Sequence, residues 1–259
     1  MTPRGRRIAD RTFSAAGALL GAALFAFLAL PIVALFVTSG PEAWLAGLAH
    51  PITAPALLLS LLTTTVSLVV LVIFGTPLAW WIARGRSRAA RIVDAVAQLP
   101  IVIPPAVAGL ALLLAFGRRG LLGTEALDIA FTTTAVVLAQ TFVAAPFYVR
   151  AASAAFASVD EELLVVARSL GASRARVLFG VAVPLARRGL VAGAALAWAR
   201  ALGEFGATLM FAGNLGGRTQ TLPLAVYTAL ESDLRAAQAM AVVLVLVALA
   251  LLVLIRGRA

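Results

Sequence analysis

Two oppositely charged residues, Arg200 and Glu204, stand four positions apart inside an apolar stretch of the sequence. Residues at this spacing share one face of a helix, so the two side chains can form an ion pair. Charged side chains within a membrane-spanning helix are costly and by default indicate a functional site. Two interpretations stay open, because a gate and a structural packing clamp would use the same pair. Gly203 and Gly206 flank the glutamate and allow bending or close approach.

Other residue types that perform catalysis or bind metals are scarce. The sequence has no cysteine, which excludes disulfides and thiolate metal sites, and its single histidine, His50, adjoins a proline in a predicted surface loop. No Gly-x-x-x-x-Gly-Lys-Ser/Thr segment is present to hold nucleotide phosphates. An intramembrane enzyme needs a catalytic set such as paired aspartates or a serine with a histidine. We therefore expect a non-catalytic protein without metal or cofactor.

Composition predicts an all-α integral membrane protein. The chain is 62% hydrophobic and 12% charged, with a mean hydropathy of +1.03. Its apolar residues fall into runs of about 20 or more, the length that a helix needs to cross a bilayer. The net charge of +10 does not indicate nucleic-acid binding, because the arginines are spread among the loops.

Six transmembrane helices are predicted, and they must position the charged pair. They cover residues of about 14–38, 56–83, 100–116, 131–153, 185–211 and 236–255. Residues 1–12 form a polar N-terminal tail, residues 13–259 form the transmembrane domain, and a loop is expected around Gly40–Pro55. Pro104 and Pro105 lie in the first turns of the third span. Irregular backbone at that depth is tolerated where protein or water covers it, so this span is expected to line a pathway.

The distribution of arginine predicts the orientation of these helices, because arginine is enriched in cytoplasmic loops. With the N-terminus inside, the outer side holds only Arg118, Arg119, Arg218 and Arg235, and Arg200 lies within the fifth span. The inner side holds Arg4, Arg6, Arg7, Arg11, Arg84, Arg86, Arg88, Arg91, Arg150, Arg168, Arg174, Arg176, Arg187, Arg188, Arg256 and Arg258. Both termini and residues 157–184 are therefore predicted to be cytoplasmic.

A short motif occurs twice in the predicted spans. Residues 107–112, VAGLAL, are echoed by residues 191–196, VAGAAL, and Pro100 matches Pro184 at the same offset. Duplication and chance both remain open as explanations. In either case Gly109 and Gly193 predict close helix packing at both places.

The segment between the fourth and fifth spans is the long stretch that is too polar to lie inside a membrane. Acidic residues at its front favour a helix N-terminus, namely Asp160, Glu161 and Glu162. An apolar stripe follows at helical spacing, formed by Leu163, Val166, Ala167 and Leu170. Gly171 can end this helix in a left-handed conformation. A second short helical turn carries Arg174 and Arg176, and Pro184 opens the next apolar segment.

This segment resembles the cytoplasmic loop of ABC importer permeases, which has Glu-Ala-Ala-x-x-x-Gly, nine residues, and Ile-x-Leu-Pro. Ala167, Gly171 and Pro184 match outright, Val181 and Val183 are conservative, and Val165 and Val166 replace the family's Glu and first Ala. The resemblance implies that residues of about 157–184 form coupling helices that seat in a groove of an ATPase subunit. The implied coupling residues are Leu163, Val165, Val166, Ala167, Leu170, Gly171, Ala172, Arg174 and Pro184.

The chain resembles the molybdate and tungstate branch of these permeases more specifically. The resemblance is carried by residues 99–110, 116–120, 199–214 and 216–227, and it extends over residues of about 55–235. Sulfate permeases have a related Gly-Glu-Phe/Tyr-Gly segment. The resemblance implies a translocation path or gate that includes Arg200, Gly203, Glu204, Phe205, Gly206, Thr208 and Asn214.

The resemblance implies the permease subunit of an ATP-driven molybdate importer, which forms the oxyanion path as a homodimer in the lipid of the bacterial cytoplasmic (inner) membrane. Two ATPase subunits inside supply the hydrolysis, and an oxyanion-binding protein outside supplies most of the selectivity. Sulfate, thiosulfate or tungstate import remains the alternative within transporters. A passive anion channel is the alternative from another class, and its flux would need neither ATP nor a second subunit.

Overall fold

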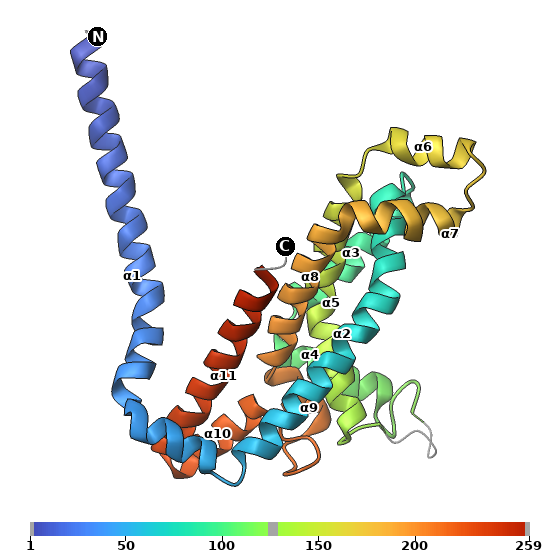
Figure 1. The fold of residues 1–259 in the computed structure, drawn as a ribbon. Helices are drawn as coiled ribbons and strands as arrows, with labels where there is room; N and C mark the ends of the chain where they lie inside the picture. Colours follow the sequence, from blue (N-terminus) through green and yellow to red (C-terminus); the bar gives the residue numbers. More distant parts are fainter. Residues whose placement is uncertain (1–2, 124–128, 257–259) are drawn as a thin grey trace.

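The structure is a computed structural model that describes residues 3–123 and 129–256, and every regular element among them is a helix (Figure 1). The elements are α1 (Pro3–Ala49), α2 (Thr53–Arg84), α3 (Arg88–Val102), α4 (Pro105–Phe116), α5 (Thr133–Ala157), α6 (Glu161–Ser169), α7 (Arg174–Val177), a π-helical turn (Leu178–Ala182), α8 (Val183–Leu202), α9 (Gly206–Ala212), α10 (Leu222–Ser232) and α11 (Leu234–Arg256).

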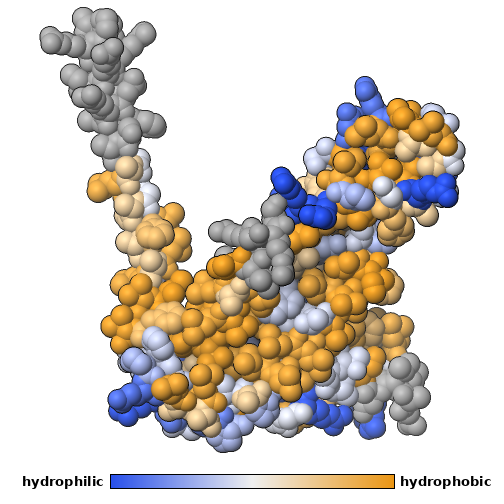
Figure 2. Space-filling view, in the orientation of Figure 1, coloured by the Kyte–Doolittle hydropathy of each residue, from blue (hydrophilic) through white to orange (hydrophobic). Residues whose placement is uncertain are grey.

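Within the described residues, five helices are long and apolar enough to cross a membrane, and the bent pair α3–α4 makes a sixth if it is one span. The five segments are Ala16–Glu42, Thr53–Arg84, Thr133–Ala157, Arg174–Leu202 and Leu234–Leu251. Figure 2 shows apolar residues over most of the visible face, with hydrophilic residues near both ends. The predicted all-α membrane class is confirmed.

The bent pair α3–α4 returns the chain from one end of the bundle to the other. Helices α2 and α5 are parallel, because their contacts advance together along both: Ser67 in the middle of α2 contacts Gln140 in the first half of α5, and Arg84 at the end of α2 contacts Phe156 at the end of α5. The segment between them must therefore recross the bundle. It does so with a 118° bend between α3 and α4. Irregular backbone was predicted at Pro104 and Pro105, but the recrossing segment begins at Arg88, earlier than the predicted start near residue 100. Pro105 explains the break, because proline disfavours helical geometry at the residue before it.

The first helix is longer than predicted at both ends. Residues 3–12 are helical and continuous with the apolar segment, while the cytoplasmic placement of this tail stays a prediction, and residues 1–2 lie outside the described residues. The loop predicted around Gly40–Pro55 is also mostly helical. Only Gly40, at φ 66°, interrupts the helix, so that α1 turns sharply and packs its last two turns on α11 (Figure 1).

Close helix packing occurs at both glycine motifs, as predicted. A Cβ added to Gly109 of α4 would lie 2.7 Å from the carbonyl oxygen of Ala207 in α9. A Cβ added to Gly193 of α8 would lie 2.7 Å from Cβ of Ala151 in α5. Because no larger side chain fits without a shift of its neighbour, these glycines fix the spacing of two helix pairs.

The predicted fifth span at 185–211 differs from the observed helices in two ways. The helix does not begin at Pro184 but continues from α7 through the π-helical turn into α8. Pro184 has no N–H to donate to the preceding turn, and the helix is locally widened to a π-helical turn just before it. It ends at Leu202, and a break at residues 203–205 precedes α9. Helix α10 was not predicted, although Pro223 in its first turn is a typical start signal.

Candidate functional site

Helix α6 begins as its acidic residues predict. Asp160 is the N-cap, and its carboxylate accepts a hydrogen bond from the backbone N–H of Glu162 at 2.9 Å. Glu161 and Glu162 occupy the first turn, where negative charge is favourable beside the unpaired N–H groups. The helix therefore has a fixed start just beyond the end of α5.

Gly171 ends α6 with the predicted left-handed residue. Its φ is +83°, its N–H donates to the carbonyl of Arg168 at 2.9 Å, and the N–H of Ala172 donates to the carbonyl of Ala167 at 3.1 Å. This pair of bonds is a Schellman motif, in which the glycine is free of the Cβ penalty. Ala167 and Ala172 pack against the core below, so the motif also fixes the direction in which α7 begins.

The apolar stripe predicted on α6 is mostly exposed, apart from Ala167, which is partly buried. Leu164, which is not part of this stripe, is fully buried in the core, at 3% exposure. Leu170 is 83% exposed, and Leu163, Val165 and Val166 are about half exposed. Together with Arg174 of α7, which is also exposed, they form what we call the α6 surface, on a projection at one end of the bundle (Figure 1).

Arg84 anchors this projection to the bundle, a role that the sequence analysis did not assign. Its Nη2 donates to the carbonyls of Phe156 and Val159, both at 2.8 Å, and its guanidinium lies 5.3 Å from the ring centroid of Trp80. A basic side chain on the last carbonyls of a helix is favourable. The spacing of Trp80 and Arg84 at the end of α2 was the available sequence signal, but the partner on α5 is distant in sequence.

The predicted ion pair between Arg200 and Glu204 is confirmed. Arg200 Nη2 lies 2.8 Å from Glu204 Oε2, and the side chains are 27% and 1% exposed. Glu204 lies in the break between α8 and α9, so the pair joins the end of one helix to the start of the next. Glu204 Oε1 also accepts from the N–H of Ala207 at 2.7 Å. The carboxylate is thus a charge partner and a cap at once.

The remaining predicted gate residues differ in exposure. Gly203 is exposed, whereas Thr208 is fully buried. Phe205 stacks at a tilt on Tyr227 of α10, with ring centroids 5.3 Å apart. Asn214 donates to Thr228 of α10 at 2.8 Å. Tyr227 and Thr228 are neighbours that the sequence analysis missed because α10 itself was not predicted.

The structure separates the coupling residues from the gate residues. Pro184 lies in the first turn of α8 and Arg200 in its last, and 20 helical residues span about 30 Å. Pro184 is exposed, and it lies at the end of α8 that continues into α7. The two groups of predicted residues therefore lie toward the two ends of one helix.

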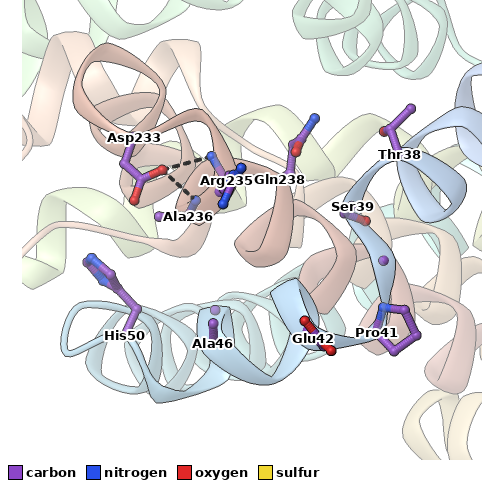
Figure 3. A pocket seen from close by; sticks show the side chains of 12 residues that line it. Thr38, Ser39, Pro41, Glu42, Ala46, His50, Asp233, Arg235, Ala236 and Gln238 are labelled. Atoms are coloured by element: carbon purple, nitrogen blue, oxygen red, sulfur yellow. Dashed lines mark hydrogen bonds between the residues drawn. The ribbon is translucent and has the colours of Figure 1, made fainter.

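A polar pocket of about 810 Å³ lies near the bend of α1 (Figure 3). Glu42 of α1 and His50, the residue after α1, form one side, and Asp233, Arg235 and Gln238 form the other. Asp233 accepts from the N–H groups of Arg235 and Ala236 at 2.9 and 3.2 Å, so its carboxylate caps α11. Among the described residues no group of three or more His, Cys, Asp or Glu side chains could hold a metal ion.

Comparisons with known proteins agree on one family. The family model described as "Binding-protein-dependent transport system inner membrane component" matches residues 75–257. The chain is 46% identical over 220 residues to a molybdenum transport system permease protein of Mycobacterium tuberculosis, covering 83% of each protein. It is 39% identical over 242 residues to a probable transport system permease protein of Clostridium pasteurianum, covering 92% of this chain and 85% of the relative.

Solved structures show the same fold at lower identity. A bacterial ABC transporter involved in the import of alginate matches with a TM-score of 0.72, at 16% identity over 98% of both chains. The MetNI methionine ABC transporter in an inward-facing conformation matches with a TM-score of 0.63, at 20% identity over 80% of this chain and 95% of that one. The chain is therefore a multi-pass membrane protein that belongs to the family of binding-protein-dependent transport system inner membrane components.

Proposed function

We propose that the chain is the permease subunit of an ATP-driven molybdate importer and that two copies form the oxyanion path. The proposal rests on the family and on relatives named as molybdenum transport permeases at 38–46% identity. In this role the chain is a non-catalytic subunit. ATP hydrolysis is supplied by two copies of a separate ATPase, and an external oxyanion-binding protein delivers the substrate.

The α6 surface is the single observation that carries the coupling role. Apolar side chains about half or more exposed are costly in water, and a cluster of them favours a protein contact. These lie on a helix that is capped at both ends and tied to the bundle through Arg84. Because the unit is rigid, a displacement of α6 by a bound partner would be transmitted to α5 and α8. The coupling helices are therefore assigned to α6 and α7.

Val165 stands where the family has a glutamate, and it is about half exposed on this surface. Docking here then depends on apolar contact rather than on a carboxylate at this position. Glu161 and Glu162 are exposed at the start of the same helix, and Arg174 is exposed at the start of α7. These charges give the contact its orientation.

The path is assigned to the two breaks in the helices. At α3–α4 and α8–α9 the backbone is irregular, and in a membrane this is tolerated where protein or water covers it. Arg200 is 27% exposed at the second break. A guanidinium suits a tetrahedral oxyanion through paired hydrogen bonds. Glu204 neutralises it in the closed state, and opening frees it to meet the substrate.

Orientation follows from the arginine distribution, which favours the α6 surface and both termini on the cytoplasmic side. The polar pocket at the bend of α1 then lies on the outer side.

The test is uptake of radiolabelled molybdate into proteoliposomes that contain the permease, its ATPase and its binding protein. ATP-dependent uptake that excess tungstate but not sulfate suppresses supports the molybdate assignment. Suppression by sulfate or thiosulfate at equal concentration would assign the importer to those anions instead. Flux without ATP or without the ATPase would assign a channel.

A further inference from the structure

An apolar groove of about 520 Å³ lies on the bundle near the α6–α7 end, separate from the α6 surface and from the Arg200–Glu204 break. Its walls come from α2, α5, the π-helical turn and α8. The lining residues are Val72, Ile73, Thr76, Pro77, Tyr148, Phe179, Val183, Arg187, Leu190, Val191 and Ala194. A groove of this size is within the range of small-molecule sites.

One helix face gives the groove its polarity. Arg187, Leu190, Val191 and Ala194 are spaced i, i+3, i+4 and i+7, so they share a face of α8. Of these four residues the charged one is nearest to the α6–α7 end, with Phe179 and Val183 of the groove nearer still, and the apolar residues follow for about 10 Å along the helix. This length fits within the roughly 15 Å of one leaflet's hydrocarbon. A cation followed by an apolar wall suits the phosphate and the acyl chain of a phospholipid.

Arg187 is available to a ligand. It is exposed, and within the part of the chain that the structure describes it forms no hydrogen bond or ion pair. Side chains on a helix lean toward its N-terminus, so Arg187 leans toward Val183 and the α6–α7 end. An arginine in this position extends its guanidinium to the headgroup level while its stem stays in the groove.

The groove presents little else for a polar ligand. The hydroxyls of Thr76 and Tyr148 are 2.7 Å apart and hydrogen-bonded to each other. Thr76 is 8% and Tyr148 2% exposed, and the other lining residues apart from Arg187 are apolar. A small oxyanion would lose its hydration on such a wall and gain one cation. A lipid phosphate at Arg187 keeps its contact with water while its acyl chain covers the apolar wall.

We propose that this groove binds an anionic phospholipid of the cytoplasmic leaflet, with the phosphate on Arg187 and an acyl chain along α8 toward Ala194. The leaflet follows from the proposed orientation. The bound chain would pack on α2, α5 and α8 together, the three helices that also hold the α6–α7 projection. Basic pockets between transmembrane helices on the cytoplasmic side bind such headgroups.

The experiment is native mass spectrometry of the full-length chain in detergent, titrated with phosphatidylglycerol or phosphatidylcholine that carry the same palmitoyl and oleoyl chains. We expect retention of phosphatidylglycerol about fivefold above phosphatidylcholine, the factor that one basic side chain supplies at a membrane surface. Arg187→Gln should abolish this preference. Arg188→Gln is the matched control, because it removes the same charge from the adjacent exposed residue, which does not line the groove.

Two further variants separate the groove from the charge. Ala194→Phe fills the apolar end and should weaken both lipids, whereas Arg187→Lys should keep the preference for phosphatidylglycerol. Equal effects of Arg187→Gln and Arg188→Gln would overturn the assignment, as would displacement of the lipid by molybdate. The chain has no cysteine, so oxidation of Val191→Cys that joins two copies would place a second copy over the groove and also overturn it. Lipid retention is measured without transport, so this experiment tests the lipid site independently of the proposed molybdate import.

Discussion

Gly206 lies directly against Pro105. A Cβ added to Gly206 would be 2.9 Å from Cβ of Pro105 and 3.4 Å from the backbone nitrogen of Ala106. Pro105 is the first residue of α4 and Gly206 the first of α9. The break between α3 and α4 and the break between α8 and α9 therefore pack directly against each other.

This contact predicts that Gly206→Val destabilises the protein and impairs molybdate uptake. The added side chain must push α9 away from Pro105, and overpacking of this kind costs about 1–3 kcal/mol. Thermal unfolding in detergent and uptake in proteoliposomes measure the two effects. Gly21→Ala is the control, because nothing lies within 4 Å of its added Cβ and a helix-interior alanine is favourable. Equal melting temperatures for both variants and wild type would contradict the packing argument.

Gly171→Val should uncouple ATP hydrolysis from transport while the bundle remains folded. Nothing lies within 4 Å of the added Cβ, so the effect comes from the φ of +83° alone, which costs about 1–2 kcal/mol for a residue with a side chain. The Schellman motif should open and α6 should lose its fixed direction. ATPase activity and uptake of the reconstituted complex are the measurements. Normal coupling in a stably inserted variant would show that the bend is incidental. Gly180→Ala, which meets Arg176 only at 3.7 Å, is the control.

Arg84→Ala should loosen the α6–α7 projection. The change removes two charged hydrogen bonds to the carbonyls of Phe156 and Val159, and bonds to charged groups contribute about 1.5–3 kcal/mol each. Hydrogen exchange should rise in residues 158–172 and remain unchanged in α10. Arg86→Ala is the matched control, since the Arg86–Glu161 pair is 3.4 Å long and 90% and 62% exposed, and exposed pairs contribute about 0–1 kcal/mol. Similar exchange in both variants would contradict the anchoring role.

The sequence allowed prediction of the features that depend on local chemistry. The acidic start of α6, its left-handed end at Gly171, the pairing of Arg200 with Glu204 and the glycine contacts at 109 and 193 all follow from residue type and short spacing. Span positions followed from the lengths of the apolar runs. Each of these features is decided within a few turns of helix.

The features that were missed depend on partners distant in the sequence. One exception is local: the four-residue spacing of Arg200 and Glu204 does not show that Glu204 also caps α9, where the expected fifth span is broken. Helix α10 is held by the N–H of Leu222, which donates to Ser60 Oγ in α2 at 2.7 Å. The role of Arg84 depends on the carbonyls of α5. None of these contacts leaves a periodic pattern in the sequence.

Reporter fusions test the proposed orientation. A periplasmic alkaline phosphatase fused after Gly120 or Gly216 should be active, and one fused after Ser87 or Ser173 should be inactive. The reason is the arginine distribution, which retains these inner loops on the cytoplasmic side. Activity at Ser173 would place the α6 surface outside and remove the coupling assignment with it. A cytoplasmic reporter at the same positions should show the opposite pattern and controls for expression.

The last prediction separates a gate from a clamp at Arg200 and Glu204. Arg200→Ala leaves a carboxylate that is 1% exposed without its charge partner, and breaking such a pair costs about 3–5 kcal/mol. Glu204→Gln leaves the arginine unpaired but retains an oxygen for the N–H of Ala207, so it should unfold at a higher temperature than Glu204→Ala. The double variant Arg200→Ala with Glu204→Gln has neither charge and keeps the cap, and it should be more stable than Arg200→Ala alone. If Arg200 contacts the oxyanion, this folded double variant should transport no molybdate although its ATPase still docks. Recovered uptake would make the pair a structural clamp, and stability losses that simply add would show that the two side chains do not interact.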